Sequence, residues 1–78
     1  MSKKRRQLYD IECFVHRVTN KAALLSPASD VYSTLQAWFP VSEIAFESDD
    51  FVSELVDTKV IVTIPEWLIY EKGWENYV

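Results

Sequence analysis

With 78 residues, 49% of them hydrophobic and 14% aromatic, the chain has the length and composition of one small folded domain rather than of a disordered segment. The single cysteine excludes an internal disulfide and a cysteine-ligated zinc site, and no apolar run approaches the roughly 18 residues of a membrane span. The net charge of −4 is unevenly distributed, because the chain is basic up to Ala22 and strongly acidic after it. A mostly acidic chain argues against a protein that reads duplex DNA.

The N-terminal residues carry a basic cluster, Lys3-Lys4-Arg5-Arg6. No apolar run follows this cluster, so it does not predict a secretory signal, and we expect a cytoplasmic protein. We assign residues 1–7 to a flexible basic tail and residues 8–78 to a single domain.

The first half of the domain predicts two strands and a third after a loop. Apolar side chains alternate from Tyr9 to Val15, which predicts a half-buried strand extending to about Val18. A turn at 19–21 and a short return strand from Ala22 to Leu25 complete a hairpin. Residues 26–30 have the composition of a loop. The alternation resumes from Thr34 to Phe39 and ends at Pro40, which has no N–H to donate to a strand ladder.

The acidic stretch from Ala45 to Asp57 allows two interpretations. Hydrophobic residues at i and i+4 (Phe51 with Leu55, Val52 with Val56) are compatible with one or two helical turns. An acidic loop with one hydrophobic anchor fits the composition equally well. A tight crossing segment, Val41 to Ile44, precedes this stretch.

The C-terminal part predicts one more strand and a helix. Val60, Val62 and Ile64 alternate along a strand from Lys59 to Ile64. Pro65 suits a first helical position and Gly73 the residue just after a helix, so we expect a helix from Pro65 to Lys72. Trp74 is then placed to pack back on Ile69 in a Schellman-type closure.

These elements predict a mainly β fold: a small SH3-like or OB-like antiparallel barrel, or a strongly bent sheet, with a short C-terminal helix. Trp67, Leu68 and Trp74 are expected to pack the helix against the sheet. The predicted core comprises Ile11, Cys13, Val15, Leu24, Leu35, Ala37, Phe39, Ile44, Val60, Val62, Ile64 and Trp67.

Groups for catalysis or metal binding do not combine into a site. Cys13 and His16 are an odd number of residues apart in the predicted strand, so their side chains point to opposite faces and a Cys–His nucleophile pair fails on geometry. Gly73 is the only glycine, which excludes a glycine-rich phosphate loop. The acidic residues lack the spacing of a calcium loop. We therefore expect no enzyme activity, no metal and no cofactor.

Two surfaces of opposite charge are candidates for binding. The first is acidic and interleaved with aromatic residues, and it would suit a partner with a basic channel for nucleic acid. Its residues are Glu43, Glu47, Asp49, Asp50, Phe51, Glu54 and Asp57. The second is basic and would suit a single-stranded nucleic acid, with Phe14, His16, Tyr32 and Trp38 as aromatic side chains for stacking. Its residues are Lys3, Lys4, Arg5, Arg6, Arg17 and Lys21.

Two motifs resemble segments of a group of small phage and prophage proteins. They are W-x-P-x-S-x-I at residues 38–44 and I-P-x-W-L-x-x-x-K-G at residues 64–73, and the segment 15–25 is similar to the first hairpin of that group. The chain departs from the group at two places: the hairpin from Ser26 to Thr34 is longer than expected, and the acidic run after Ile44 is richer. No functional residues transfer from the group, because its motifs read as structural.

The resemblance implies a phage-type accessory role. Because small acidic phage proteins include inhibitors of host defence such as anti-CRISPR proteins, the leading hypothesis is a non-enzymatic protein that inhibits or modulates a host protein through its acidic and aromatic residues. The host protein could be a nucleic-acid-binding defence complex, and the location would be the host cytoplasm. The alternative is a single-strand nucleic-acid binder. A monomer, a homodimer and a larger homo-oligomeric structural piece remain open.

Overall fold

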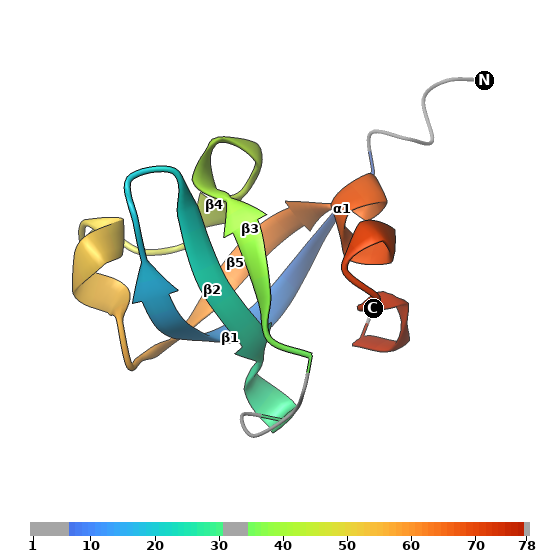
Figure 1. Ribbon diagram of the computed structural model, residues 1–78, viewed down its shortest axis with the longest axis horizontal. Coiled ribbons are helices and arrows are strands. Elements are labelled where there is room, and N and C mark those ends of the chain that lie inside the picture. Colours follow the sequence, from blue (N-terminus) through green and yellow to red (C-terminus); the bar gives the residue numbers. More distant parts are fainter. Residues whose placement is uncertain (1–6, 31–34, 78) are drawn as a thin grey trace.

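The computed structural model describes residues 7–30 and 35–77. Its strands are β1 (Leu8–Val18), β2 (Ala22–Pro27), β3 (Ala37–Pro40), β4 (Ala45–Phe46) and β5 (Lys59–Pro65), and its α-helix is α1 (Glu66–Glu71) (Figure 1). Short 3₁₀ turns lie at Ala28–Asp30 (η2), Val41–Glu43 (η3), Val52–Leu55 (η4) and Glu75–Tyr77 (η5). The mainly β prediction with a short C-terminal helix is confirmed.

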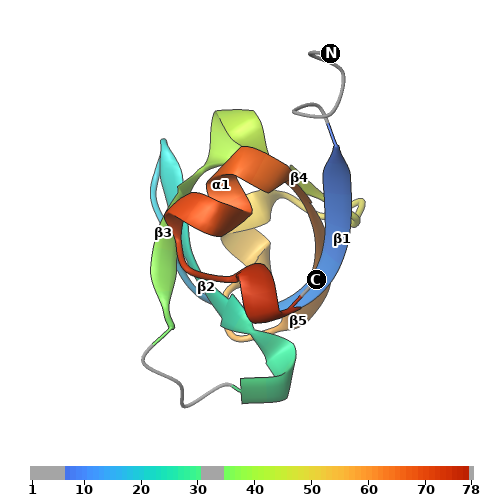
Figure 2. The same ribbon diagram turned by 90° about the vertical axis from the view of Figure 1, so that its right-hand side faces the viewer.

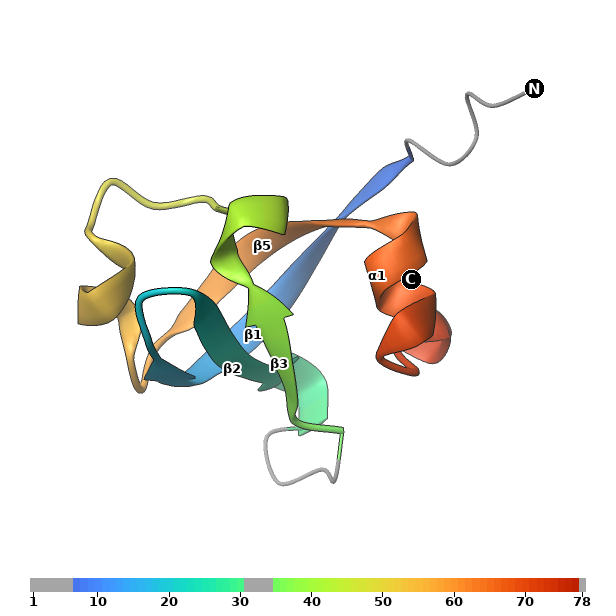
Figure 3. The same ribbon diagram turned by 45° about the horizontal axis from the view of Figure 1, so that its top comes forward.

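The strands form one antiparallel sheet in the order β3-β2-β1-β5-β4. The edge strands β3 and β4 do not pair with each other, so the sheet is bent rather than closed into a barrel. It curls around its core, and α1 lies across one end (Figure 2). The segment from Glu47 to η4 lies at the opposite end, as Figure 3 also shows.

The hairpin β1–β2 forms as the alternation predicts, and a threonine organises its turn. The Thr19 hydroxyl accepts hydrogen bonds from the N–H groups of Lys21 and Ala22 and donates to the Ala22 carbonyl, at 3.3, 3.1 and 3.1 Å. A side chain thus supplies the local hydrogen bonds that favour a turn here in the absence of an Asn-Gly pair. The register shifts between Val15 and Arg17, which leaves His16 as the extra residue of a β-bulge.

The predicted boundaries of three elements differ from those observed. Strand β2 continues through Ser26 and Pro27, which were expected in a loop, and both side chains are buried. Strand β3 is shorter than predicted, since it begins at Ala37, and Thr34 lies outside the described residues. Pro65 precedes the helix in an extended conformation (φ −69°, ψ 149°) and α1 begins at Glu66.

The core lies between the curved sheet and α1. Most of the predicted core residues are buried, but Trp67 was placed there wrongly because 47% of its surface is exposed. Leu24 is only half-buried, since its neighbours Ala23 and Leu25 turn inward instead. The buried residues absent from the predicted core list are Ala23, Leu25, Leu55, Leu68, Ile69 and Trp74, although Leu68 and Trp74 were expected to pack the helix against the sheet.

The closure after α1 follows the Schellman pattern. The Trp74 N–H donates to the Ile69 carbonyl at 2.9 Å and the Gly73 N–H to the Tyr70 carbonyl at 3.2 Å, while Gly73 has a left-handed φ of 75°. This turn directs the fully buried Trp74 onto Phe39, with ring centroids 4.8 Å apart in an edge-to-face arrangement. Trp74 Nε1 also donates to the Leu35 carbonyl at 2.9 Å. Of the two tryptophans expected to pack this region, Trp74 therefore does so and Trp67 does not.

Candidate functional site: an acidic pocket beside β5

The acidic segment after β4 is a loop with one 3₁₀ turn, and it is anchored by Leu55. The Asp50 N–H donates to Ser48 Oγ at 3.1 Å, and the Glu54 N–H donates to the Phe51 carbonyl at 2.8 Å. Leu55 is 5% exposed, and the Thr58 hydroxyl donates to its carbonyl at 2.6 Å. Both sequence interpretations thus hold in part: one short turn forms, and a single hydrophobic side chain holds the acidic loop to the body.

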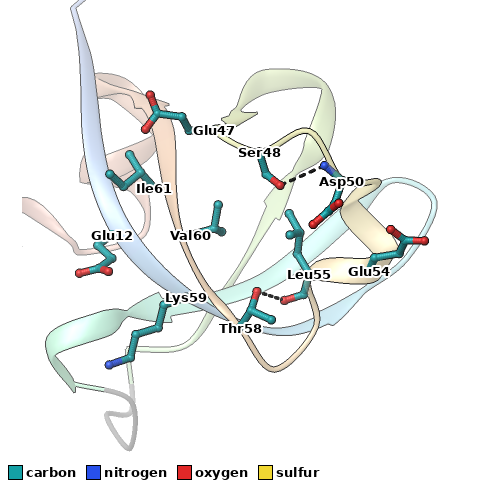
Figure 4. Close-up of a pocket in the computed structure, with 10 residues that line it drawn as sticks. All are labelled: Glu12, Glu47, Ser48, Asp50, Glu54, Leu55, Thr58, Lys59, Val60 and Ile61. Atoms are coloured by element: carbon teal, nitrogen blue, oxygen red, sulfur yellow. Dashed lines mark hydrogen bonds between the residues drawn. The ribbon is translucent and has the colours of Figure 1, made fainter.

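A pocket of about 410 Å³ lies between this loop and β5. Leu55 and Val60 contribute apolar surface to it (Figure 4). Four acidic residues, Glu12, Glu47, Asp50 and Glu54, and the basic residue Lys59 also line it. Glu12 and Glu47 lie on the β1–β5 side, and Asp50 and Glu54 lie on the loop side. We call these four carboxylates the acidic rim.

The acidic rim is not neutralised by ion pairs within the part of the chain that the structure describes. The ion pair found there joins Lys72 to Glu71 at 4.0 Å, on α1 at the other end of the molecule. The same residues contain no group of three His, Cys, Asp or Glu side chains close enough to hold a metal ion. Four carboxylates against one ammonium group therefore make this pocket attractive to a cationic partner.

The structure divides the predicted acidic surface. Glu47, Asp50 and Glu54 line the pocket, whereas Glu43 in η3 and Asp49 in the loop are exposed outside its lining. Phe51 directly precedes η4 and is 78% exposed, so it lies beside the pocket as an exposed aromatic side chain. Aromatic residues are enriched at the centre of protein interfaces and polar groups at their rim, so Phe51 with the carboxylates around it suits an interface.

Asp57 has a backbone role that its sequence position did not reveal. Its φ is 67°, in the left-handed region, and its N–H donates to the Val15 carbonyl at 2.7 Å. It therefore turns the chain from η4 into β5. Aspartate is among the few residues other than glycine that adopt this conformation readily, which explains its presence there without any role in binding.

Sequence reasoning did not include Glu12, Lys59 or Ile61 in the site. Each was placed on the outward side of a predicted strand, but which strands pair was not known. Strands β1 and β5 pair with Glu12 opposite Ile61 and Phe14 opposite Lys59, and this register brings the outward residues of both strands to the pocket. The alternation along each strand predicted the correct face for each of these residues. Only the register between β1 and β5 shows that they lie together at one pocket.

The predicted basic surface is only partly described. Lys3, Lys4, Arg5 and Arg6 lie outside the described residues. Arg17 and Lys21 are exposed near the β1–β2 turn, at the end of β1 remote from Gln7. Because β1 has 11 residues at about 3.3 Å each, more than 30 Å of strand separates that turn from the first described residue. The aromatic side chains Phe14 and His16 are half-buried, Trp38 is 43% exposed, and Tyr32 is not among the described residues.

The cysteine and the histidine do not meet. Cys13 is fully buried, donates from Sγ to the Ile11 carbonyl at 3.3 Å, and has its thiol pKa raised to about 12 by burial and, to a smaller degree, by Glu12. His16 Nε2 instead hydrogen-bonds Ser26 Oγ at 2.8 Å, under the edge-to-face ring of Phe14. Ser26 has no exposed surface, so this Ser–His pair satisfies a buried hydroxyl and offers no access to a substrate.

No family model matches the chain, and neither the curated proteins nor the solved structures contain a significant match to it. Among the described residues, none of the helices has the length and apolar character needed to span a membrane.

Proposed function

We propose that this protein is a phage-type accessory protein that inhibits or modulates a host protein by direct binding, in the manner of anti-defence proteins such as anti-CRISPR proteins. The observation that carries the proposal is the acidic rim around the pocket, with the exposed Phe51 beside it. The resemblance of residues 38–44 and 64–73 to small phage proteins supports the biological setting. The binding itself is non-enzymatic and takes place in the host cytoplasm.

The charge of the described body supports a basic protein partner. All 12 carboxylates of the chain lie between Asp10 and Glu75, and only four basic residues, Arg17, Lys21, Lys59 and Lys72, accompany them there. Such an excess attracts a cationic surface and accelerates its association. It also repels a phosphate backbone, which weighs against nucleic acid as the ligand of this face.

A specific interface needs an anchoring side chain in addition to complementary charge, and Phe51 supplies it. Charge steers association, but affinity comes mainly from a few side chains that become fully desolvated on binding, aromatic ones above all. Phe51 is the most exposed of the large hydrophobic side chains in the described residues, and the hydrogen bond from Glu54 to its carbonyl holds its backbone in a turn. Its ring is therefore available at little cost in backbone order.

The proposal is tested by affinity capture from host lysate with three forms of the protein. The wild type should retain a specific partner, and the double variant Asp50→Lys/Glu54→Lys should lose it. Glu71→Lys/Glu75→Lys is the matched control, because it makes the same change of charge at exposed positions near the opposite end of the molecule. Phe51→Ser should weaken capture by roughly thirtyfold or more, since truncation of an aromatic hot spot costs about 2 kcal/mol or more.

Two outcomes would contradict the proposal. The first is equal capture by the rim variant and the control variant, since it would show that the acidic rim is not the binding face. The second is binding of single-stranded oligonucleotides that weakens steeply with salt and survives Asp50→Lys/Glu54→Lys, since it would favour the basic surface instead. Circular dichroism of each variant establishes that the fold is retained.

A further inference from the structure

One edge of β5 lacks a neighbouring strand over half of its length. Strand β4 has only two residues, Ala45 and Phe46, which pair with Thr63 and Val62. Within the described residues no strand lies on that side of Lys59, Val60 and Ile61. The pocket lies beside this open stretch, because the same three residues line it. An open strand edge presents unpaired N–H and C=O groups that can pair with another chain.

The hydrogen-bond pattern shows which groups point into the pocket. The Val15 N–H donates to the Thr58 carbonyl at 3.0 Å and the Val15 carbonyl accepts from the Asp57 N–H at 2.7 Å, so Val15, one residue beyond the β1–β5 ladder, points its backbone groups toward the β5 side, as a residue of a hydrogen-bonded pair does. Since such pairs alternate in antiparallel strands, Val60 points its backbone groups at β1, whereas Lys59 and Ile61 point theirs away from it. The Glu47 N–H, which donates to the Ile61 carbonyl at 2.8 Å, confirms this direction. The Lys59 N–H and C=O and the Ile61 N–H therefore face the pocket without a strand to receive them.

We infer that this pocket binds an extended, basic peptide segment that adds to the sheet as a strand beside Lys59–Ile61. The open edge supplies main-chain hydrogen bonds, and the acidic rim supplies charge complementarity to lysine or arginine side chains. Side chains alternate along an added strand, so one residue faces Leu55 and Val60 while its neighbours face the solvent side. The preferred segment accordingly reads basic, apolar, basic.

This inference rests on the proposed function, because both take the acidic rim as the binding surface. It adds the chemical nature of the segment that the partner contributes. The partner contributes an extended Lys/Arg-rich segment rather than a folded helix or a nucleic acid strand. Main-chain hydrogen bonds distinguish strand addition from attraction between charges alone, because these hydrogen bonds need free N–H donors along one edge of the peptide.

The test uses three capped, fluorescent heptapeptides of alternating lysine and valine. The first is unmodified, the second carries N-methyl groups on its central lysine amides, and the third carries them on its central valine amides. An added strand turns only one of these two sets of amides toward β5. One methylated peptide should therefore bind roughly tenfold or more weakly than the parent, the loss expected for about 1.4 kcal/mol of hydrogen bonding, while the other binds like the parent. Equal binding by all three peptides, or an equal loss for both methylated ones, would overturn the inference.

Protein variants give an independent measurement. Ile61→Pro removes one of the two N–H groups that face the pocket without touching the β1 ladder, and proline is tolerated at such an edge position. This variant should bind the unmodified peptide more weakly than the wild type does, by a similar factor. Asp50→Asn/Glu54→Gln should reduce binding and its dependence on salt, whereas Glu71→Gln/Glu75→Gln should leave both unchanged. Unchanged peptide affinity in both the proline and the Asp50→Asn/Glu54→Gln variants would refute the site.

The two proposals fail in distinguishable ways. If the lysine–valine peptides bind equally but capture of the host partner still depends on Asp50 and Glu54, the strand addition is wrong and the proposed function stands. If the peptides discriminate as expected but capture does not depend on those residues, the edge is a peptide site and the proposed function is wrong.

Discussion

Replacing Trp74 with alanine should destabilise this protein more than any other single tryptophan substitution. The side chain is fully buried, packs edge-to-face on Phe39 at 4.8 Å, and donates a hydrogen bond to the Leu35 carbonyl at 2.9 Å. Removing a buried tryptophan side chain costs about 3–5 kcal/mol from lost transfer energy and the cavity that remains. That loss is a large fraction of the roughly 5–15 kcal/mol by which small domains are stable.

Trp67→Ala is the matched control, because it deletes the same side chain from the same region. Trp67 is 47% exposed, so only part of its apolar surface leaves water on folding, and we expect a loss of no more than about 1.5 kcal/mol. Trp74→Phe separates the two contributions of Trp74. It keeps an aromatic ring near Phe39 but removes the hydrogen bond to Leu35, and should fall between the two alanine variants.

The assay is urea unfolding followed by far-ultraviolet circular dichroism, which does not depend on the number of tryptophans. The midpoint should fall in the order wild type, Trp67→Ala, Trp74→Phe, Trp74→Ala, with the slope of the transition unchanged. A Trp67→Ala cost equal to or above that of Trp74→Ala would refute the helix orientation. So would a Trp74→Ala cost below about 1 kcal/mol, against the 3–5 kcal/mol typical of a buried aromatic residue. If Trp74→Ala does not fold, the comparison of Trp74→Phe with Trp67→Ala still decides the matter.

Three further predictions concern the thiol and two left-handed residues. Burial raises the pKa of Cys13 from 9.0 to about 12, so its protonated form stabilises the fold below pH 9 and this contribution declines as the pH rises from about 9 to about 12. At about 1.4 kcal/mol per pH unit, the free energy of unfolding should decline on the order of 4 kcal/mol over this range. Cys13→Ala should make the free energy of unfolding less dependent on pH above pH 9. An equally steep decline in the variant would contradict the attribution of this pH dependence to Cys13. Gly73→Ala should cost about 1 kcal/mol in urea unfolding, because a Cβ there meets nothing within 4 Å and only the left-handed φ of 75° penalises it. Asp57→Val should cost about 1–2 kcal/mol for the same reason, whereas Asp57→Gly should leave both stability and partner capture near those of the wild type.

Local sequence patterns were sufficient for most of the strands. The alternation from Tyr9 to Val15 and from Val60 to Ile64 places the same residues inward that the structure buries or half-buries, because a period of two follows from strand geometry alone. Gly73 with Trp74 likewise predicted the closure after the helix, since a Schellman turn depends on a few neighbouring residues. Boundaries were less accurate at Ser26 and Pro27, where pairing with β1 extends a strand into a segment of loop composition.

The orientation of α1 could not be read from its sequence. Trp67, Leu68, Ile69 and Tyr70 are consecutive and all hydrophobic, so no polar stripe indicates which side of the helix faces water. The contacts of the sheet make the choice: Leu68 and Ile69 turn inward, and the space over Phe39 is filled by Trp74 from beyond the helix. Trp67 and Tyr70 are left on the outside.

The candidate site divides in the same way. The sequence by itself determined that an acidic stretch with Glu47, Asp50 and Glu54 follows a tight crossing segment, and that Glu12 and Lys59 point outward from their strands. Only the tertiary structure decided that these groups surround one pocket, because residues 12 and 61 meet through the pairing of β1 with β5. That pairing is an interaction between distant segments, and it also determines which backbone groups of β5 are left without a strand. Strand pairing, which no local pattern encodes, is therefore what turns an acidic loop into an acidic pocket with an open sheet edge.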